Sequence, residues 1–199
     1  MTDPEEIARS LVAIADAFET LSVTWAIGGS LASAAHGEPR ATNDVDVIAI
    51  LTEDAARELV AQLGEDFYAD AEVAAEAARS RSSFNIIDNR SFIKIDVFVP
   101  AVGPLGTGQL DRLRMLEILP GVRPLPILGP EDVILQKLRW YTLGGGVSDR
   151  QWRDIVSVLR ISDDAIDQAY LDDVAKREGL TAVLERARDD AKAGNPIIA

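Results

Sequence analysis

Cysteine is absent from this sequence of 199 residues, and histidine occurs once, as His36. Without thiols the chain forms no disulfide, no cysteine-ligated zinc site and no thiol-dependent active centre. One histidine likewise excludes a metal site built from several imidazoles. We expect His36 to pack or to face solvent at the end of a helix rather than to catalyse.

Long apolar runs are missing as well. No stretch of about 18 consecutive apolar residues occurs, so we expect no transmembrane helix and no membrane partner. The first residues, Met1–Glu6, are acidic, and no basic segment with an apolar core behind it follows them. A secretory signal needs a basic segment followed by an apolar core, and we therefore expect a cytoplasmic protein.

Basic residues are scarce, because 20 Lys and Arg stand against 33 Asp and Glu, for a net charge of −13. Proteins that bind nucleic acids usually present a basic face, since phosphate contacts supply much of their affinity. Local basic clusters remain near 112–123 and 137–153. The overall balance nevertheless favours a protein or a small molecule over a nucleic acid as the partner.

The composition, with 47% hydrophobic residues, is that of a globular protein long enough to bury a core. Hydrophobic spacing and turn signals predict an α+β fold, with a small mixed β-sheet core flanked by helices over 1–128 and a C-terminal helical segment over 129–199 packed on that core. The expected strands are 23–27, 44–51, 84–87 and 91–99. The expected helices are an N-terminal one with an apolar stripe from Ile7 to Leu21, then 30–36, 53–63, 130–143, 149–160, 164–177 and 181–193. Residues 65–79 are predicted as a helix or a mobile segment, and 113–128 contain strand-like pieces without a clear pattern.

A glycine turn joins the first expected strand to the helix after it. Gly28 and Gly29 end the strand, and Ser30 opens the helix. Glycines at such a turn let the backbone approach an anion closely, and the free N–H groups at a helix start favour negative charge. The turn therefore suits a phosphate group, although the same two glycines also occur in ordinary tight turns.

Two carboxylates, Asp44 and Asp46, begin the next expected strand. Alternation places them on one face, and the residues between and after them are apolar. Adjacent carboxylates on one face repel each other unless a cation lies between them, and Mg²⁺ suits such a pair together with phosphate oxygens. The alternative is a solvated strand start with two independent aspartates.

A third carboxylate, Asp96, lies within 91–99, the strongest strand pattern in the chain, and shares a face with Lys94. An isolated aspartate within a central strand would be costly to bury. Beside Asp44 and Asp46 it could complete a metal site and act as a base on an attacking hydroxyl. The alternative is an edge strand whose Lys94 and Asp96 face is solvated.

These residues together resemble the DNA polymerase beta-like nucleotidyltransferase superfamily. The resemblance rests on Gly29-Ser30, the thirteen-residue gap to Asp44-Val45-Asp46-Val47, and the later Asp96. The tract 36–44 is similar to small bacterial members, including AbiEii-type toxins of toxin–antitoxin and abortive-infection systems, and the stretches 130–138 and 149–155 look like C-terminal motifs of the same group.

The resemblance implies a nucleotidyltransferase core and a reaction. A nucleoside triphosphate is bound with Mg²⁺ or Mn²⁺, an acceptor hydroxyl attacks the α-phosphate, and pyrophosphate leaves. Asp44 and Asp46 would be metal ligands, and Asp96 would be a metal ligand and base. Gly28, Gly29 and Ser30 would hold the triphosphate, and Arg40 and Thr42 flank the carboxylates where they could touch phosphate.

Lys137 is a candidate on its own pattern, because it falls in the middle of the apolar arc of helix 130–143. A lysine there must extend to the surface, pair with an acid or meet an anion such as a phosphate. Asp154 lies off the apolar arc of its own helix, and we expect it to be solvated.

The function expected from these observations is transfer of a nucleoside monophosphate from the triphosphate to an acceptor hydroxyl. The acceptor would be a protein or a small molecule, with tRNA less favoured by the charge. The protein could be the toxin half of a toxin–antitoxin or abortive-infection system with a cognate antitoxin. The alternative is a catalytically silent protein of the same fold that binds nucleotide or regulates a partner.

Overall fold

The computed structural model describes residues 4–40, 42 and 44–194. The chain forms two compact units. Of the described residues, the first comprises 4–31, 42 and 44–127, and the second comprises 32–40 and 128–194. Helix α2 (Gly29–His36) begins in the first unit and ends in the second.

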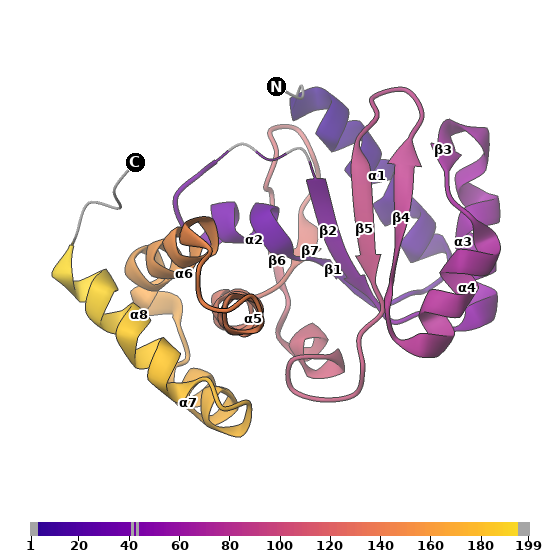
Figure 1. Ribbon diagram of the computed structural model, residues 1–199. Helices are drawn as coiled ribbons and strands as arrows, with labels where there is room; N and C mark the ends of the chain where they lie inside the picture. Colours follow the sequence, from indigo (N-terminus) through magenta and orange to yellow (C-terminus); the bar gives the residue numbers. More distant parts are fainter. Residues whose placement is uncertain (1–3, 41, 43, 195–199) are drawn as a thin grey trace. The chain divides into compact units, whose positions relative to one another are not determined.

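A mixed sheet forms the framework of the first unit (Figure 1). Within the described residues it has seven strands in the order β3-β4-β5-β2-β1-β7-β6. β2 runs parallel to β5, and β1 runs parallel to β7, whereas the other neighbours are antiparallel. The strands are β1 (Trp25–Ile27), β2 (Asp44–Ala49), β3 (Phe67–Tyr68), β4 (Ser83–Asp88), β5 (Lys94–Phe98), β6 (Arg114–Leu116) and β7 (Leu125–Ile127). The mixed α+β fold predicted from the sequence is confirmed.

Alternation in the two central strands follows the sequence pattern. Val45 and Val47 of β2 and Ile95 and Val97 of β5 are at most 1% exposed, so one face of both strands belongs to the core. The alternating residues of β5, which are Lys94, Asp96 and Phe98, are half-buried. Because side chains alternate along a strand, the half-buried positions share the opposite face.

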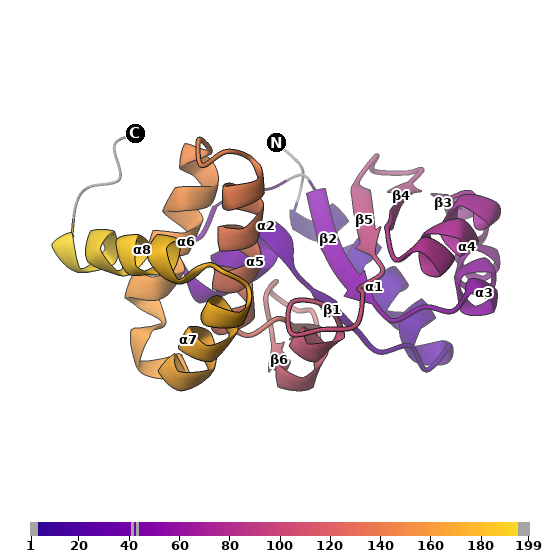
Figure 2. The ribbon, with the colours of Figure 1, turned by 60° about the horizontal axis from the view of Figure 1, so that its bottom comes forward.

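Three helices of the first unit lie on one side of this sheet (Figures 1 and 2). They are α1 (Pro4–Thr20), α3 (Glu53–Leu63) and α4 (Ala71–Ser80). Leu11, Ile14 and Phe18 form the predicted apolar stripe of α1 and are fully buried. Side-chain caps set two of the helix starts, since Thr52 accepts a hydrogen bond from the backbone of Ala55, and Asp70 does the same at α4.

In two regions without a clear sequence pattern, pairing with other strands defines the secondary structure. The stretch 65–79, predicted as a helix or a mobile segment, begins in a 3-10 turn (Gly64–Asp66), passes through strand β3 and ends within α4. Residues 113–128 contain β6 and β7, preceded by a 3-10 helix (Thr107–Arg112), and Ile127 pairs with Ile27. Strands of two or three residues are too short to show a period, so only their partners define them.

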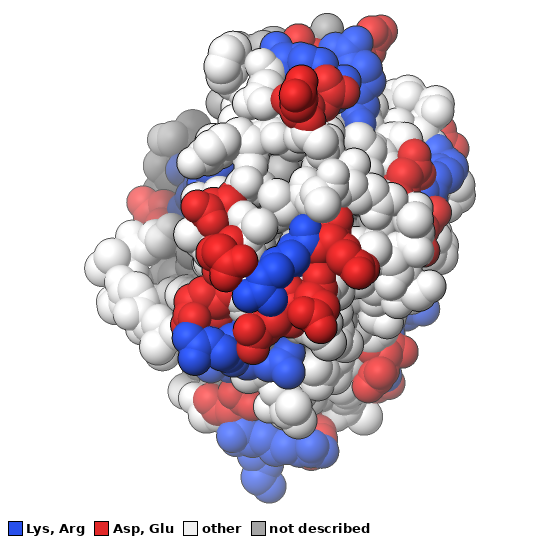
Figure 3. Space-filling view, turned by 90° about the vertical axis from the view of Figure 1, so that its right-hand side faces the viewer, with Lys and Arg blue, Asp and Glu red and all other residues white. Residues whose placement is uncertain are grey.

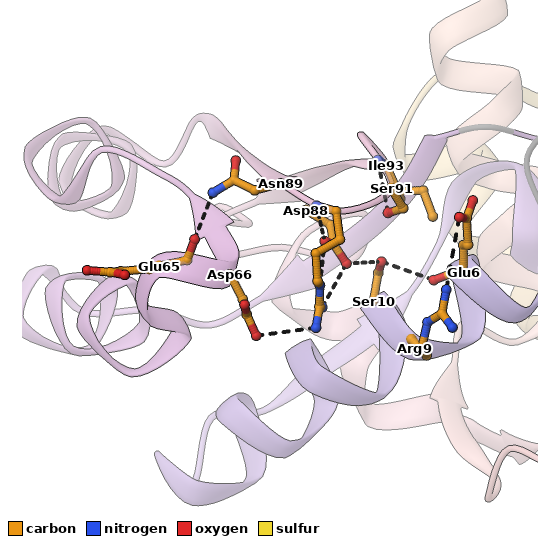
Figure 4. A network of polar contacts seen from close by, with 10 residues as sticks. Glu6, Arg9, Ser10, Glu65, Asp66, Asp88, Asn89, Ser91 and Ile93 are labelled. Atoms are coloured by element: carbon orange, nitrogen blue, oxygen red, sulfur yellow. Dashed lines mark hydrogen bonds and ion pairs between the residues drawn. The ribbon is translucent and has the colours of Figure 1, made fainter.

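A buried polar network ties α1 to the hairpin between β4 and β5 (Figure 4). Asp88 is 2% exposed and accepts hydrogen bonds from Ser10 Oγ at 2.7 Å and from the backbone N–H of Arg90 at 2.9 Å. The Arg90 guanidinium adds two more bonds to Asp88 and one to Asp66. Burial alone would raise the pKa of Asp88, but these donors outweigh it and lower the pKa to about 2.

Asp88 is therefore expected to make the free energy of unfolding depend on pH at low pH. Its folded pKa of about 2 lies below the ordinary value of 3.8, so its contribution is present above about pH 4 and is lost as the pH falls toward 2. Asp88→Asn should lower the free energy of unfolding at pH 7 by about 2 kcal/mol and remove this part of the acid dependence. Urea unfolding at pH 7 and pH 3 measures both effects. Asp66→Asn, which alters an exposed pair with the same arginine, should change stability by less than about 1 kcal/mol, and an equal loss in both variants would contradict the assignment.

Helices make up the second unit, together with the end of α2. They are α5 (Pro130–Leu143), α6 (Asp149–Ile161), a 3-10 turn (Asp163–Ala165), α7 (Gln168–Arg177) and α8 (Thr181–Ala193). Inside this unit, His36 is buried and its Nε2 lies 2.8 Å from the carbonyl oxygen of Leu128, so it packs at the end of α2. Across the described parts of both units, each helix is too short or too polar to cross a bilayer.

Candidate functional site

Three of the predicted site residues share one face of the sheet. The parallel register of β2 and β5 sets Asp46 beside Asp96 and Asp44 beside Lys94. Asp44 is exposed, and Asp46 and Asp96 are half-buried. Residues paired across neighbouring strands point to the same side, so strands about fifty residues apart place the three carboxylates on one face. Their role as metal ligands, and that of Asp96 as base, stay predictions.

The glycine turn lies against the same carboxylates. The Gly28 N–H donates to the backbone carbonyl of Asp46 at 2.9 Å. Gly29 has a φ of 53°, and a Cβ atom placed there would be 1.8 Å from Asp46 Oδ2. Any side chain at position 29 would displace the carboxylate as well as strain the backbone. The turn and the acidic face therefore form one cradle, in which only glycine allows this approach.

Lys94 adds a positive charge to this face. Its Nζ lies 2.8 Å from Asp96 Oδ2. The hydrogen bond to Asp96, followed by the negative charges of Asp96, Asp44 and Asp46, raises the pKa of Lys94. The sequence places Lys94 on this face but does not reveal the contact. The only signal for it is the spacing of two residues between Lys94 and Asp96.

The fit of a metal ion to this site depends on donor type and on arrangement. Three carboxylates supply the oxygen donors that Mg²⁺ and Mn²⁺ prefer, and the Gly29 cradle keeps one of them close to a turn suited to phosphate. Within the part of the chain that the structure describes, no three acidic or histidine side chains are already grouped so that they could hold a metal ion. The donor set fits the ion, and Asp96 is paired with Lys94 instead.

A second charged cluster lies inside the helical unit. Asp154 of α6 accepts a hydrogen bond from Arg40 Nε at 3.1 Å and another from Arg40 Nη2 at 3.2 Å. Lys137 Nζ of α5 lies 2.8 Å from Asp154 Oδ2. Burial would raise the pKa of Asp154, but the hydrogen bonds and charges of these two cations hold it below the ordinary value.

The expectation that Asp154 is solvated was wrong, because the residue is 8% exposed and paired with two cations. Helical spacing placed it off the apolar arc, but spacing within one helix does not show a lysine on α5 or an arginine after α2. The same contact shows how the Lys137 ammonium is accommodated, because it pairs with the Asp154 carboxylate inside the protein. Its contact with a nucleotide phosphate stays a prediction.

Thr42 and Ser30 lie beside the carboxylates and the glycine turn in the sequence. Thr42 Oγ1 donates to the backbone carbonyl of Asp44 at 3.1 Å, so it supports the start of β2. Ser30 is half-buried in the first turn of α2, directly after the glycines. Phosphate contacts of Ser30, Thr42 and Arg40 stay predictions.

The surface over α3 and α4 carries both signs of charge (Figure 3). Arg57 Nε of α3 lies 2.9 Å from Glu72 Oε1 of α4, and its Nη1 lies 3.6 Å from Asp54 Oδ1. Arg79 pairs with Glu76 on the same helix. Because these arginines are neutralised by neighbouring acids, this face is not the basic surface that nucleic-acid binding would require.

No family model and no curated protein matches the chain. Solved structures do match. An antigenic nucleotidyltransferase-like protein from Paracoccidioides brasiliensis superposes with a TM-score of 0.56 at 17% identity, covering 93% of this chain and 94% of that one.

The antibiotic-resistance factor ANT(2'')-Ia, solved in complex with adenylyl-2''-tobramycin, matches with a TM-score of 0.56 at 14% identity, covering 91% of this chain and 98% of the other. Its solution structure matches with a TM-score of 0.54 at 14% identity over 96% and 97% of the two chains. At these identities the likeness concerns the fold alone. The chain thus has the fold of nucleotidyltransferase-like proteins, the fold that the resemblance of its glycine turn and strand carboxylates implies.

Proposed function

We propose that this protein is a metal-dependent nucleotidyltransferase, which moves a nucleoside monophosphate from a nucleoside triphosphate to an acceptor hydroxyl. The observation that carries the proposal is the register of β2 and β5, which sets Asp46 beside Asp96 and Asp44 beside Lys94. The close approach of Gly29 to Asp46 supports it, because it joins a phosphate-suited turn to the carboxylates.

Asp44, Asp46 and Asp96 are the residues that would hold Mg²⁺ or Mn²⁺. When bound, a divalent ion would neutralise phosphate charge and orient the attacking and leaving oxygens. The protein would contribute positioning and charge more than a nucleophile of its own.

In the proposed reaction the turn from Gly28 to Ser30 holds the triphosphate, and Ser30 contributes its hydroxyl, while the Gly28 N–H stays bonded to the Asp46 carbonyl. Asp96 accepts the proton of the acceptor hydroxyl, whose oxygen forms a bond to the α-phosphorus. The bond from that phosphorus to the bridging oxygen breaks, and pyrophosphate leaves with the electron pair. General-base help of this kind typically contributes a factor of about 10² to 10⁴.

Arg40 and Lys137 are proposed to neutralise the triphosphate further. Asp154 pairs with both, so two cations and one carboxylate leave one positive charge in this cluster. Asp154 would act as a positioning residue that holds the guanidinium and the ammonium in place. Thr42, beside Asp44, is proposed as an additional phosphate contact.

The acceptor is proposed to be a protein or a small molecule rather than tRNA. The net charge of −13 and the neutralised arginines over α3 and α4 support this choice. ANT(2'')-Ia, a protein of similar fold, was solved in complex with adenylyl-2''-tobramycin, a small molecule that carries an adenylyl group. A role as the toxin of a toxin–antitoxin or abortive-infection pair, with a cognate antitoxin, is the corresponding proposal for a protein acceptor.

A second function, catalytically silent nucleotide binding or regulation, is favoured by one observation. Lys94 forms an ion pair with Asp96, and the described carboxylates are not grouped so that they could hold a metal ion. Such a protein would bind nucleotide without transferring any part of it.

Incubation of the purified protein with each α-³²P-labelled nucleoside triphosphate, Mg²⁺ and a total cell extract tests the two functions. We expect one class of molecule to become labelled, and we expect EDTA to abolish the labelling because the carboxylates would then lack their cation. The label should travel with the α-phosphate, so γ-labelled triphosphate is the matched control. Nucleotide binding without transfer would favour the silent function, and labelling that survives EDTA would contradict metal dependence.

A further inference from the structure

Lys94 completes a square of four charged residues on neighbouring strands. Asp44 and Lys94 form one cross-strand pair, and Asp46 and Asp96 form the next. Three carboxylates and one ammonium leave two negative charges, which one divalent cation would balance. Lys94 is in direct contact with one of these acids, Asp96.

The contact of Lys94 uses the same oxygen region that a metal ion would need. Its Nζ lies 2.8 Å from Asp96 Oδ2. A Mg²⁺ ion binds carboxylate oxygens at about 2.0–2.1 Å, so an ammonium that kept this hydrogen bond would lie within a few ångströms of the ion. Like charges at that separation repel.

The Lys94 side chain can leave Asp96 without a change in the strands. Its side chain is 42% exposed, whereas that of Asp96 is 17% exposed. The flexible four-carbon stem can carry the ammonium into solvent. Ion pairs with an exposed partner are weak, so a divalent ion can displace the lysine while the strands keep the carboxylates in register.

We propose that Lys94 is an internal counter-ion that competes with the divalent cation for Asp96 and thereby lowers the metal affinity of the site. This inference rests on the proposed function, since it assigns the carboxylates to metal binding. Lys94 acts as a positioning residue, which holds Asp96 while the cation is absent. In the metal-free protein Lys94 offsets part of the negative charge on this face through Asp96, and metal binding requires Lys94 to leave.

Binding of Mn²⁺, followed through the electron paramagnetic resonance signal of the free ion, tests this competition without using activity. Lys94→Met keeps the length of the stem and removes the charge. It should bind Mn²⁺ about tenfold more tightly than the wild type, a size set by a partly exposed and screened charge. Lys94→Arg keeps the charge and should stay within about threefold of the wild type.

The matched control is Lys176→Met, which makes the same change at an exposed position on α7. It should leave Mn²⁺ affinity unchanged. Equal affinity of Lys94→Met and the wild type, or weaker binding by Lys94→Met, would overturn the competition. A thermal unfolding measurement gives an independent readout, because Mn²⁺ should raise the Tm of Lys94→Met more than that of the wild type.

An additional variant separates this inference from the proposed function. If the wild type binds Mn²⁺ and Asp46→Asn does not, the carboxylate site stands whatever Lys94→Met shows. Equal binding by Lys94→Met would then remove the inference alone. Absence of Mn²⁺ binding in the wild type and in Lys94→Met would remove the inference together with the metal site.

Discussion

Asp46→Asn is expected to lower nucleotidyl transfer by about a thousandfold while the protein stays folded. Asp46 is the carboxylate that lies between the glycine turn and Asp96. Asparagine keeps its shape but removes the negative charge, so the site loses a ligand of the cation that would stabilise the transition state. Loss of one preorganised electrostatic contact typically costs about 10² to 10³ in rate, and we expect the upper end here because the lost charge would be a ligand of the cation.

Transfer of the α-labelled nucleotide to the acceptor identified in the extract provides the measurement. Asp54→Asn is the matched control, because it makes the same change in the first turn of α3, where the Asp54 side chain is 96% exposed. The Tm of both variants should remain close to that of the wild type. Asp46→Asn with more than a tenth of wild-type transfer would mean that this carboxylate is not a metal ligand.

Lys137→Met is expected to lose transfer activity by about two orders of magnitude and to fold normally. The lysine side chain is 12% exposed and pairs with Asp154. Arg40 keeps its two hydrogen bonds to that carboxylate when the lysine is removed, so Asp154 is not left as an unpaired buried charge. Replacing one partner of a buried pair is costly mainly when the other charge is stranded. The activity loss is the scale of removing one charge stabiliser from a transition state.

Steady-state kinetics and urea unfolding measure the two sides of this prediction. Lys192→Met, at an exposed position on α8 of the same unit, controls for the loss of one positive charge. If the lysine neutralises the transferring phosphate, its removal should lower kcat more than it raises KM. Full activity in Lys137→Met would show that the lysine only supports the packing of α5 on α6 through Asp154.

Several elements could be predicted closely because their signals are local. Helix α3 has the predicted bounds, 53–63, since Thr52 caps its start and Gly64 follows its end. The alternation of β2 and β5 is also local, because a period of two residues appears within a single strand. The shared face of Asp44 and Asp46, and that of Lys94 and Asp96, follow from this period alone.

Other features needed partners that the local pattern does not contain. Strand β3 has two residues, and only its pairing with β4 makes it a strand. Asp154 was predicted to be solvated, and its burial depends on Arg40 and Lys137, which belong to other segments. The contact between Ser10 and Asp88 spans 78 residues and has no trace in either local sequence.

The sequence by itself determined that this protein has strands with carboxylates on one face, a glycine turn before a helix and a helical C-terminal part. These properties arise from residue spacing and from the conformational freedom of glycine, which act over a few residues. Only the tertiary structure decided that Asp46 lies beside Asp96, that Gly29 touches Asp46, and that residues 32–40 group with the C-terminal helices. The physical reason is that strand register and buried ion pairs are set by segments far apart in the chain, whose contacts form only when the whole core is packed.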